Sequence, residues 1–295
     1  MEVFLNSILP LMILIAVGYF AGKIFKGDLV VFSKVTLWIF ATVLTFSFIN
    51  DHPITLRVLL SYGGAFFLLL GYNFLLFKII LRKNPQKDTF FLTSIFGNTG
   101  YLGYPVLGTA IGEKAIAYGV MYSVISVFTV NTLGIALIMK NIKDSLRKLF
   151  SLPFLYAIAA GLLLGYLGKN WRDFPKPIYL SLDMINKAAI PVITVFLGTS
   201  MSKIKLKAKN LLIITLASLH RLVVLPLLAL VVAELFGMRG LEREVFIIES
   251  AMPTAMNAAV IASAIEENPE VVSSVVAFST LLSSISLTFW INFVR

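Results

Sequence analysis

The sequence predicts an all-α polytopic membrane protein whose ten transmembrane helices form a 5+5 inverted repeat. Hydrophobic residues make up 58% of the 295 residues and charged residues only 14%, whereas soluble domains carry roughly a quarter charged residues. The mean hydropathy is +0.91. The apolar residues gather in stretches long enough to cross a bilayer, and the connections between them are too short for an extramembrane domain.

A window of about twenty residues identifies the candidate spans. They occupy residues 3–22, 29–50, 55–80, 89–111, 115–139, 152–168, 178–202, 211–236, 244–265 and 271–293. The first span lacks the basic leader and the small-residue cleavage site of a signal peptide, so we expect it to remain in the protein.

Composition also excludes several classes of function. The net charge of +10 comes from short basic clusters between apolar stretches, so we expect a lipid bilayer and no nucleic acid as partner. Without cysteine, and with only two histidines, the chain offers no metal-ligand cluster, and we expect no cofactor. No nucleophile and base constellation lies in a span, so we do not expect an enzyme.

Lysine and arginine orient the chain, because cytoplasmic loops are enriched in them. Loops on one side hold thirteen, namely Lys23, Lys26, Arg82, Lys83, Lys87, Lys140, Lys143, Arg147, Lys148, Lys203, Lys205, Lys207 and Lys209. Loops on the other side hold eight, namely Arg57, Lys114, Lys169, Arg172, Lys176, Arg239, Arg243 and Arg295. We therefore expect a protein of the cell (inner) membrane with both termini extracytoplasmic. The lysine run at 203–209 is interpreted as a charged loop with no binding role.

Short matches between the two halves of the chain indicate an internal repeat. They pair Leu9-Pro10 with Leu152-Pro153, residues 18–23 with residues 165–169, and residues 110–113 with residues 264–267. A second unit that follows five crossings enters from the opposite face, so the halves are expected to have inverted topology. The predicted divisions are a first five-helix repeat at 1–139, a cytoplasmic linker at 140–151 and a second five-helix repeat at 152–295.

Two spans carry residues that interrupt a helix near mid-membrane. Residues 98–105 (NTGYLGYP) lie inside span four, and residues 251–257 (AMPTAMN) lie at the matching place in span nine. Lipid cannot satisfy the free N–H and C=O groups of a broken helix, so paired breaks indicate a solute site. The other intramembrane prolines are interpreted as simple kinks, namely Pro10, Pro153, Pro191 and Pro226.

The residues at these breaks also follow a known pattern. The motif Asn-Thr-x-x-x-Gly-x-Pro-x-Leu occupies Asn98, Thr99, Gly103, Pro105 and Leu107. Met252-Pro253 stands at the matching break, and span seven contains Ala188-Ala189-Ile190-Pro191 and Leu197-Gly198. With these features the chain resembles the auxin efflux carrier family over essentially its whole length.

The resemblance implies a fold similar to that of the bile acid:sodium symporters. Helices 1, 2, 6 and 7 would form a scaffold, helices 3–5 and 8–10 a transport core, and broken helices 4 and 9 would cross within that core. It implies secondary-active transport of a small organic anion by elevator-type alternating access. An auxin-like monocarboxylate and a malate- or malonate-like dicarboxylate are both compatible with the resemblance, and so is a homodimer.

The chain departs from the plant carriers in two respects. Their long cytoplasmic insert is missing, and Asn257 or Ala258 replaces their second proline after the span nine break. Both departures argue against auxin itself as the substrate.

The expected site lies where helices 4 and 9 cross. Two half-helix N-termini carry about half a positive charge each and free N–H groups, so they can bind a carboxylate without a buried cation. By resemblance, Asn98 is the foremost ligand. The other expected binding residues are Thr99, Gly100, Asn131, Thr254 and Asn257, with Pro105 and Pro253 shaping the breaks. For Asn131 an interhelical hydrogen bond is equally compatible with the sequence.

Arg221 and Glu249 are ionisable residues within spans. Arg221 lies about 15 Å deep, and Glu249 precedes the span nine break by one turn. We expect them to form a core ion pair, because an unpaired buried carboxylate is costly. The alternatives are that Arg221 caps carbonyls of a broken helix or binds the substrate carboxylate. If a proton is coupled, Glu249 is the expected carrier.

Other functions stay open at this point. A sodium-coupled symporter of the bile acid type would use oxygens of Glu249, Thr254, Asn257 and backbone carbonyls. A sensor on the same fold would bind a ligand without net flux. A channel is less consistent with the sequence, because the inverted repeat is typical of carriers.

Overall fold

The computed structural model describes residues 2–25, 29–129, 152–204 and 210–295, and within these ranges helices are joined by turns and loops, with one isolated β-bridge. The first half contains η1 (Phe4–Ile8), α1 (Leu9–Ile24), α2 (Leu29–Val35), η2 (Thr36–Ala41), α3 (Thr42–Asp51), α4 (Leu56–Phe74), η3 (Leu75–Ile80), α5 (Lys87–Ile95), η4 (Thr99–Gly103), α6 (Tyr104–Ala110) and α7 (Glu113–Thr129). The second half contains α10 (Pro153–Tyr166), η6 (Trp171–Asp173), α11 (Lys176–Met201), α12 (Leu211–Leu219), η7 (His220–Val224), α13 (Leu225–Leu235), α14 (Gly240–Ser250), α15 (Met256–Ala264) and α16 (Pro269–Val294).

Six helical segments are long and apolar enough to cross a membrane. They are Phe4–Ile24, Leu29–Asp51, Leu56–Ile80, Lys176–Met201, Leu211–Leu235 and Pro269–Val294. The molecule is therefore a multi-pass membrane protein, as the composition predicts. The four other predicted spans fall on shorter helices: α7 and α10 have 17 and 14 described residues, and the other two are each split into half-helices.

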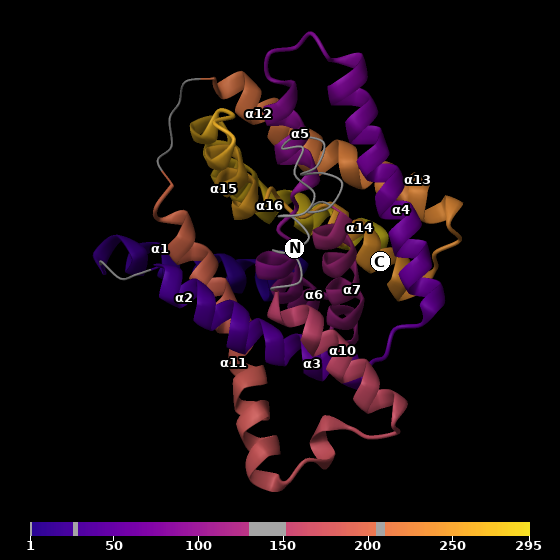
Figure 1. The fold of residues 1–295 in the computed structure, drawn as a ribbon. Coiled ribbons are helices and arrows are strands. Elements are labelled where there is room, and N and C mark those ends of the chain that lie inside the picture. Colours follow the sequence, from indigo (N-terminus) through magenta and orange to yellow (C-terminus); the bar gives the residue numbers. More distant parts are fainter. Residues whose placement is uncertain (1, 26–28, 130–151, 205–209) are drawn as a thin grey trace.

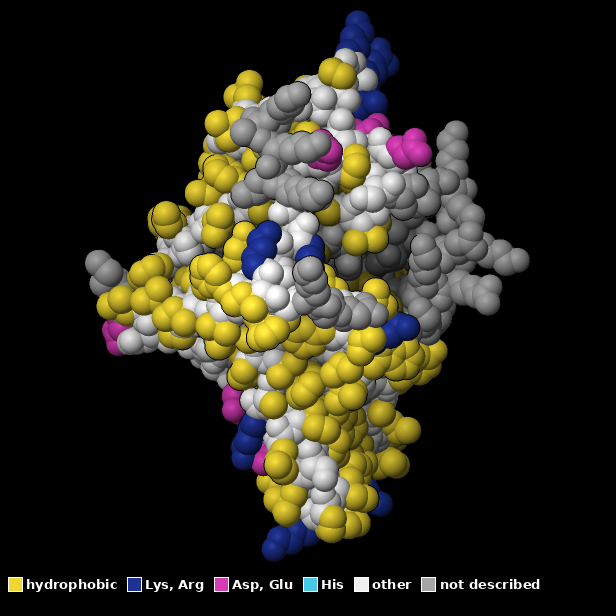
Figure 2. Space-filling view, turned by 90° about the vertical axis from the view of Figure 1, so that its left-hand side faces the viewer, with side chains coloured by type: hydrophobic (Ala, Val, Ile, Leu, Met, Phe, Trp, Pro, Cys, Tyr) yellow, Lys and Arg dark blue, Asp and Glu magenta, His cyan; other side chains and the backbone are white. Residues whose placement is uncertain are grey.

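The outer surface is apolar, as lipid requires. Hydrophobic side chains cover much of the face seen in Figure 2, and lysine and arginine side chains lie at its top and bottom and at a few places between. Individual side chains on this surface are largely exposed, among them Leu235 at 71%, Ile285 at 70% and Phe20 at 63%. Such exposure is unfavourable in water and favourable against acyl chains.

The helices form two groups. In Figure 1, α1, α2, α3, α10 and α11 lie together in the lower half, and α4, α5, α12, α13, α15 and α16 lie in the upper half. The helices α6, α7 and α14 lie between them. Within the lower group, α1 packs along α11 and α3 packs along α10.

Glycines allow α1 and α11 to touch backbone to backbone. A Cβ built at Gly18 would overlap the carbonyl of Val195, and a Cβ built at Gly198 would overlap the carbonyl of Ile15. The hydroxyl of Thr199 donates to the Gly18 carbonyl at 3.1 Å across the same contact. In lipid no hydrophobic driving force brings two helices together. Membrane helices therefore associate through close packing at small residues, as α1 and α11 do here.

The pair α3 and α10 repeats this arrangement. A Cβ built at Gly161 would stand 2.9 Å from the carbonyl oxygen of Phe46. The side-chain amide of Asn50 donates to the Gly161 carbonyl at 3.1 Å. Each half of the chain thus supplies one glycine-bearing helix that rests on a helix of the other half.

We predict that Gly198→Ala lowers the free energy of unfolding by about 1–3 kcal/mol, because the added methyl forces apart two backbones in contact. Thermal unfolding in detergent measures this loss. Gly63→Ala on α4 is the matched control, since its Cβ would meet no atom within 4 Å, and it should leave the midpoint unchanged or slightly raised. Equal midpoints for the two variants would contradict the proposed role of the close contact.

Candidate functional site

Two helices stop part-way along their length and meet. α5 ends at Ile95 and the chain becomes helical again at Thr99, while α14 ends at Ser250 and α15 begins at Met256. The two non-helical segments pair as an antiparallel bridge between Gly97 and Thr254. Two backbone bonds of 2.8 Å close it, from Asn98 N–H to the Pro253 carbonyl and from Ala255 N–H to the Phe96 carbonyl. The predicted interruptions are therefore present, and they contact each other.

One detail of the prediction is wrong, because the first break precedes the proline that was expected to cause it. The break covers residues 96–98, whereas Pro105 lies in the first turn of α6, after the π-helical turn η4. Proline lacks an N–H and fits the start of a helix, where that group has no partner. Pro253 does lie inside its break, and its carbonyl accepts the Asn98 N–H.

Arg221 joins the two half-helices that end at the crossing. Its Nε donates to the Met252 carbonyl at 2.7 Å and its Nη1 donates to the Ser94 carbonyl at 2.9 Å. Helix C-termini leave carbonyls without partners and carry partial negative charge, so a guanidinium satisfies both requirements. Arg221 is only 5% exposed, and a Cβ at Gly97 would overlap its guanidinium. Glycine at position 97 is therefore needed for this contact.

The expected ion pair between Arg221 and Glu249 is not formed. Among the described residues, the ion pairs within 4.0 Å do not include these two side chains. The guanidinium is engaged by carbonyls instead, as the capping alternative predicts. Glu249 is fully buried, and neither of its carboxyl oxygens has a hydrogen-bond partner in the described part of the chain.

The Glu249 carboxyl group rests against two glycines. A Cβ at Gly103 would stand 2.6 Å from both of its oxygens, and a Cβ at Gly119 would stand 2.8 Å from one of them. An acid packed between η4 and α7 in this way has no donor to compensate a full negative charge.

His220 belongs to the same polar group behind the crossing. Its Nδ1 lies 2.9 Å from the Ser94 hydroxyl, which itself donates to the Phe90 carbonyl. The single hydroxyl proton is thus used, so Nδ1 carries the hydrogen and donates to Ser94. The ring stacks on Tyr72 of α4 with centroids 5.9 Å apart. His220 therefore faces α4 and α5 rather than lipid.

A cavity of about 320 Å³ lies on the other side of the crossing. It is lined by Ser33, Leu37, Ala41, Thr45, Gly97, Asn98, Thr99, Gly100, Tyr101, Tyr104, Ser123, Val127, Leu152, Ile193, Ala255, Met256 and Asn257. No charged side chain is among these described residues. The cavity is bordered by residues of both helix groups and by both breaks.

The predicted binding residues divide into two sets. Asn98, Thr99, Gly100 and Asn257 line the cavity. The remaining predicted residues do not line it, namely Pro105, Pro253 and Thr254. Asn131 lies outside the described residues.

Thr254 is turned away from the cavity because its polar groups are used inside the crossing. Its hydroxyl donates to the Thr93 carbonyl at 2.8 Å, and its N–H donates to the Ser279 hydroxyl at 3.2 Å. It is fully buried. The structure thus gives Thr254 a role in holding the crossing together.

Sequence reasoning missed several polar residues of the cavity. Tyr101 and Tyr104 lie inside the motif already singled out, so their spacing could have identified them. Ser33, Thr45 and Ser123 are isolated hydroxyls in apolar spans, and no pattern distinguishes them from hydroxyls that bond their own helix. Only the tertiary arrangement brings them to the cavity.

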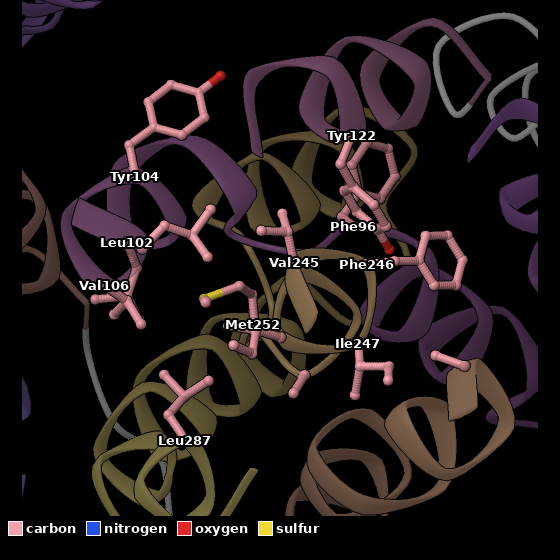
Figure 3. Close-up of a cluster of buried hydrophobic side chains, with 14 of the residues drawn as sticks. Phe96, Leu102, Tyr104, Val106, Tyr122, Val245, Phe246, Ile247, Met252 and Leu287 are labelled. Atoms are coloured by element: carbon pink, nitrogen blue, oxygen red, sulfur yellow. The ribbon is translucent and has the colours of Figure 1, made fainter. Parts of the chain in front are cut away.

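Apolar packing closes the side of η4 opposite the cavity. Figure 3 shows Leu102, Val245 and Met252 directed toward one another, whereas the ring of Tyr104 points away from this cluster. Leu102, Val245 and Met252 have no exposed surface. The packing fixes the start of the second half-helix, which in turn fixes the N–H groups beside the cavity.

The electrostatic character of the cavity comes from backbone groups. The helices that begin at Thr99 and Met256 both start on its wall, and no side chain caps either of them. The first N–H groups of a helix have no intrahelical acceptor and point outward, together with the positive end of the dipole. The cavity therefore offers two sets of donors with partial positive charge to a bound group.

Comparison with known proteins is consistent with a site of this kind. The family model described as membrane transport protein matches residues 3–146 and 140–291. The chain is 28% identical over 306 aligned positions to an uncharacterized transporter of Methanocaldococcus jannaschii, covering 97% of both chains. It is 30% identical over 199 positions to an uncharacterized transporter of Methanothermobacter thermautotrophicus, covering 65% of this chain and 63% of the other.

Proposed function

The chain belongs to the membrane transport protein family, the auxin efflux carrier type that the motif at Asn98 resembles, and we propose that it is a secondary-active transporter of small organic anions. The single observation that carries the proposal is the cavity at the crossing, where two half-helix N-termini meet and no described side chain is charged. We propose the cell membrane as its location.

The geometry suits a carboxylate. Free N–H groups at two helix starts can bind carboxylate oxygens, and amide groups of Asn98 and Asn257 can add donors. Among the described lining residues there is no lysine or arginine that would be left unpaired when the anion leaves, so release is not opposed in that way. A volume of about 320 Å³ matches a small organic anion.

Contacts between the ends of different helices support ten crossings of the membrane in alternating directions. On the side assigned to the cytoplasm, Lys203 Nζ donates to the Gly22 carbonyl and the Thr89 hydroxyl donates to Glu267. On the other side, Asn170 donates to Asp51 and Arg57 donates to the Gly237 carbonyl. Each contact joins two segments that the ten-span topology assigns to the same side of the membrane.

Packing contacts also support the inverted repeat. Gly18 and Gly161 each follow a proline by eight residues, and both accept a hydrogen bond of 3.1 Å on their carbonyl, from Thr199 and Asn50 respectively. This register aligns Pro10 with Pro153. The sequence match of residues 18–23 with residues 165–169 aligns the same helices one turn further along. We propose that the two halves correspond as the packing contacts align them, with Gly18 equivalent to Gly161.

We further propose alternating access of the elevator type, with α1–α3, α10 and α11 as the scaffold. The cavity reaches Ser33 on α2 and Leu152 at the start of α10, which the proposed topology assigns to the cytoplasmic half. At the opposite end, α6 packs on η1, and the Ser7 hydroxyl donates to the Thr109 carbonyl at 3.1 Å. The arrangement corresponds to an inward-facing state closed on the outside by α6.

A cross-link between η1 and α6 tests this motion. The chain contains no cysteine, so Ser7→Cys with Thr109→Cys introduces one defined pair. We expect oxidation to a disulfide, or a short bismaleimide, to stop uptake into proteoliposomes, with reductant restoring uptake after oxidation. Each single-cysteine variant treated identically is the control. Wild-type uptake by fully cross-linked protein would contradict movement of α6 against η1.

Glu249 is the proposed proton carrier. Its buried carboxyl group has no hydrogen-bond partner among the described residues, so the neutral acid is favoured over the ion in this state. The charged or titratable groups that interact with it are Arg221, Tyr62, Tyr104 and Tyr122. A change of its surroundings during transport would release or take up a proton.

We predict that Glu249→Gln removes the effect of a pH gradient on uptake while leaving solute binding intact, because glutamine is uncharged at every pH. Uptake with and without an imposed gradient measures the effect, and Glu242→Gln is the control for loss of another buried carboxyl group. An unchanged gradient dependence in the variant would exclude Glu249 as carrier. Sodium-dependent thermal stabilisation of the wild type would favour the sodium-coupled alternative instead.

The function itself is tested with Asn98→Ala and Arg221→Ala. Loss of Asn98 removes donors to the anion, so binding should weaken about tenfold or more while thermal stability is kept. Loss of Arg221 leaves two buried carbonyls unpaired, at about 1–3 kcal/mol each, so stability should fall. A thermal-shift screen of small mono- and dicarboxylates, followed by uptake of the best ligand, measures both effects.

Arg57→Ala is the matched control for Arg221→Ala, since Arg57 also donates to a carbonyl but is exposed. It should change stability and binding little. Full transport by Asn98→Ala would remove that residue from the site. Saturable binding without any uptake by the wild type would favour a sensor over a transporter.

A further inference from the structure

A second cavity lies at the ends of α1 and α11, away from the crossing. Its volume is about 200 Å³, and it is lined by Ala21, Gly22, Phe25, Leu29, Phe32, Val195, Thr199 and Lys203. Seven of the eight lining residues are uncharged and mostly apolar. It lies between three helices of the lower group in Figure 1, namely α1, α2 and α11.

Lys203 is the charged residue among the described residues that line this cavity. Lys203 is exposed, and its ammonium donates to the Gly22 carbonyl at 3.2 Å. An ammonium has three N–H donors, so two remain for another acceptor. The carbonyls at the C-terminus of α1 favour a cation at this point, so the lysine is held in place.

The stretches of sequence that contain Phe25 and follow Lys203 are rich in lysine. Residues 23–28 and 203–209 contain six lysines and one acid, Asp28. Lys23 follows Tyr19 by one turn, with its ammonium 5.4 Å from the ring centroid. The positive-inside distribution assigns this end of the helices to the cytoplasmic leaflet.

Apolar side chains at and next to the cavity are exposed on the outer surface. Ile24, the last residue of α1, is 71% exposed, and Phe25, which follows it and lines the cavity, is 69% exposed. An apolar cavity between transmembrane helices with a lysine in its lining matches an anionic lipid, whose phosphate needs a cation and whose acyl chains need apolar contacts.

We propose that this cavity binds an anionic phospholipid, with the phosphate on Lys203 and part of one acyl chain between α1, α2 and α11. The lipid contacts helices that pack through backbone contacts at Gly18 and Gly198, so it stabilises that helix group and leaves the cavity at the crossing open. This inference does not depend on the proposed substrate or coupling.

Thermal unfolding of the delipidated protein in a neutral detergent tests the proposal. Phosphatidylglycerol should raise the midpoint by about 3 °C or more, and phosphatidylcholine with the same chains should not. Lys203→Gln should lose most of this shift, whereas Lys203→Arg should keep it. Lys114→Gln, an exposed lysine at the start of α7, is the matched control and should keep it as well.

Two further measurements separate the headgroup from the acyl chain. Inorganic phosphate and glycerol 3-phosphate should not reproduce the shift, because they lack the chain. Leu29→Trp fills the cavity, so native mass spectrometry should find less phosphatidylglycerol retained than in the wild type. The proposal would be overturned if both lipids raised the unfolding midpoint equally, or if Lys203→Gln kept the full rise. It would also be overturned if Leu29→Trp retained as much phosphatidylglycerol as the wild type, or if free phosphate gave the full rise.

Discussion

The hydrogen bonds from Arg221 to the ends of two half-helices are the constraint on which the rest of the structure depends. Breaking two membrane helices at the same place exposes several carbonyls and N–H groups that lipid cannot satisfy. The guanidinium satisfies carbonyls of Ser94 and Met252, and the bridge between Gly97 and Thr254 satisfies further groups. The bond from Arg221 to Met252 lies within the second half of the chain, whereas the others join the two halves, so the complete crossing forms only when both halves are in place.

This arrangement separates charge across the crossing. The partial negative charges of the helix C-termini are matched by Arg221 on one side, and the positive N-termini at Thr99 and Met256 border the cavity on the other. The bridge also relates the two breaks by a local two-fold axis, which makes Asn98 equivalent to Ala255 and Gly100 equivalent to Asn257. The backbone bonds of the two breaks follow this symmetry, whereas their side chains do not.

The contacts within the lower helix group differ in kind from the contacts between the lower group and the rest of the molecule. Within the lower group, glycines bring backbones into contact and leave little freedom to slide. Between the groups, near the cavity, the contact is made by side chains: Tyr101 of η4 packs edge-on against Phe196 of α11 at 5.2 Å between ring centroids. Aromatic contacts of this kind are worth about 0.5–1.5 kcal/mol beyond area burial, so they can be exchanged during a movement at small cost. The proposed lipid site lies entirely within the tightly packed group.

The sequence by itself determined the membrane class, the interruption of both spans and four of the cavity residues, namely Asn98, Thr99, Gly100 and Asn257. The class and the presence of two breaks follow from local properties, because apolar length and helix-breaking residues act through the backbone near their own positions, whereas the four cavity residues were predicted from the motif at the breaks and its resemblance. The tertiary structure decided the partner of Arg221, the direction in which Thr254 points, and the arrival of Ser33, Thr45 and Ser123 at the cavity. A buried arginine can satisfy itself with a carboxylate or with carbonyls, and only the position of two helix ends from distant parts of the chain selects between them.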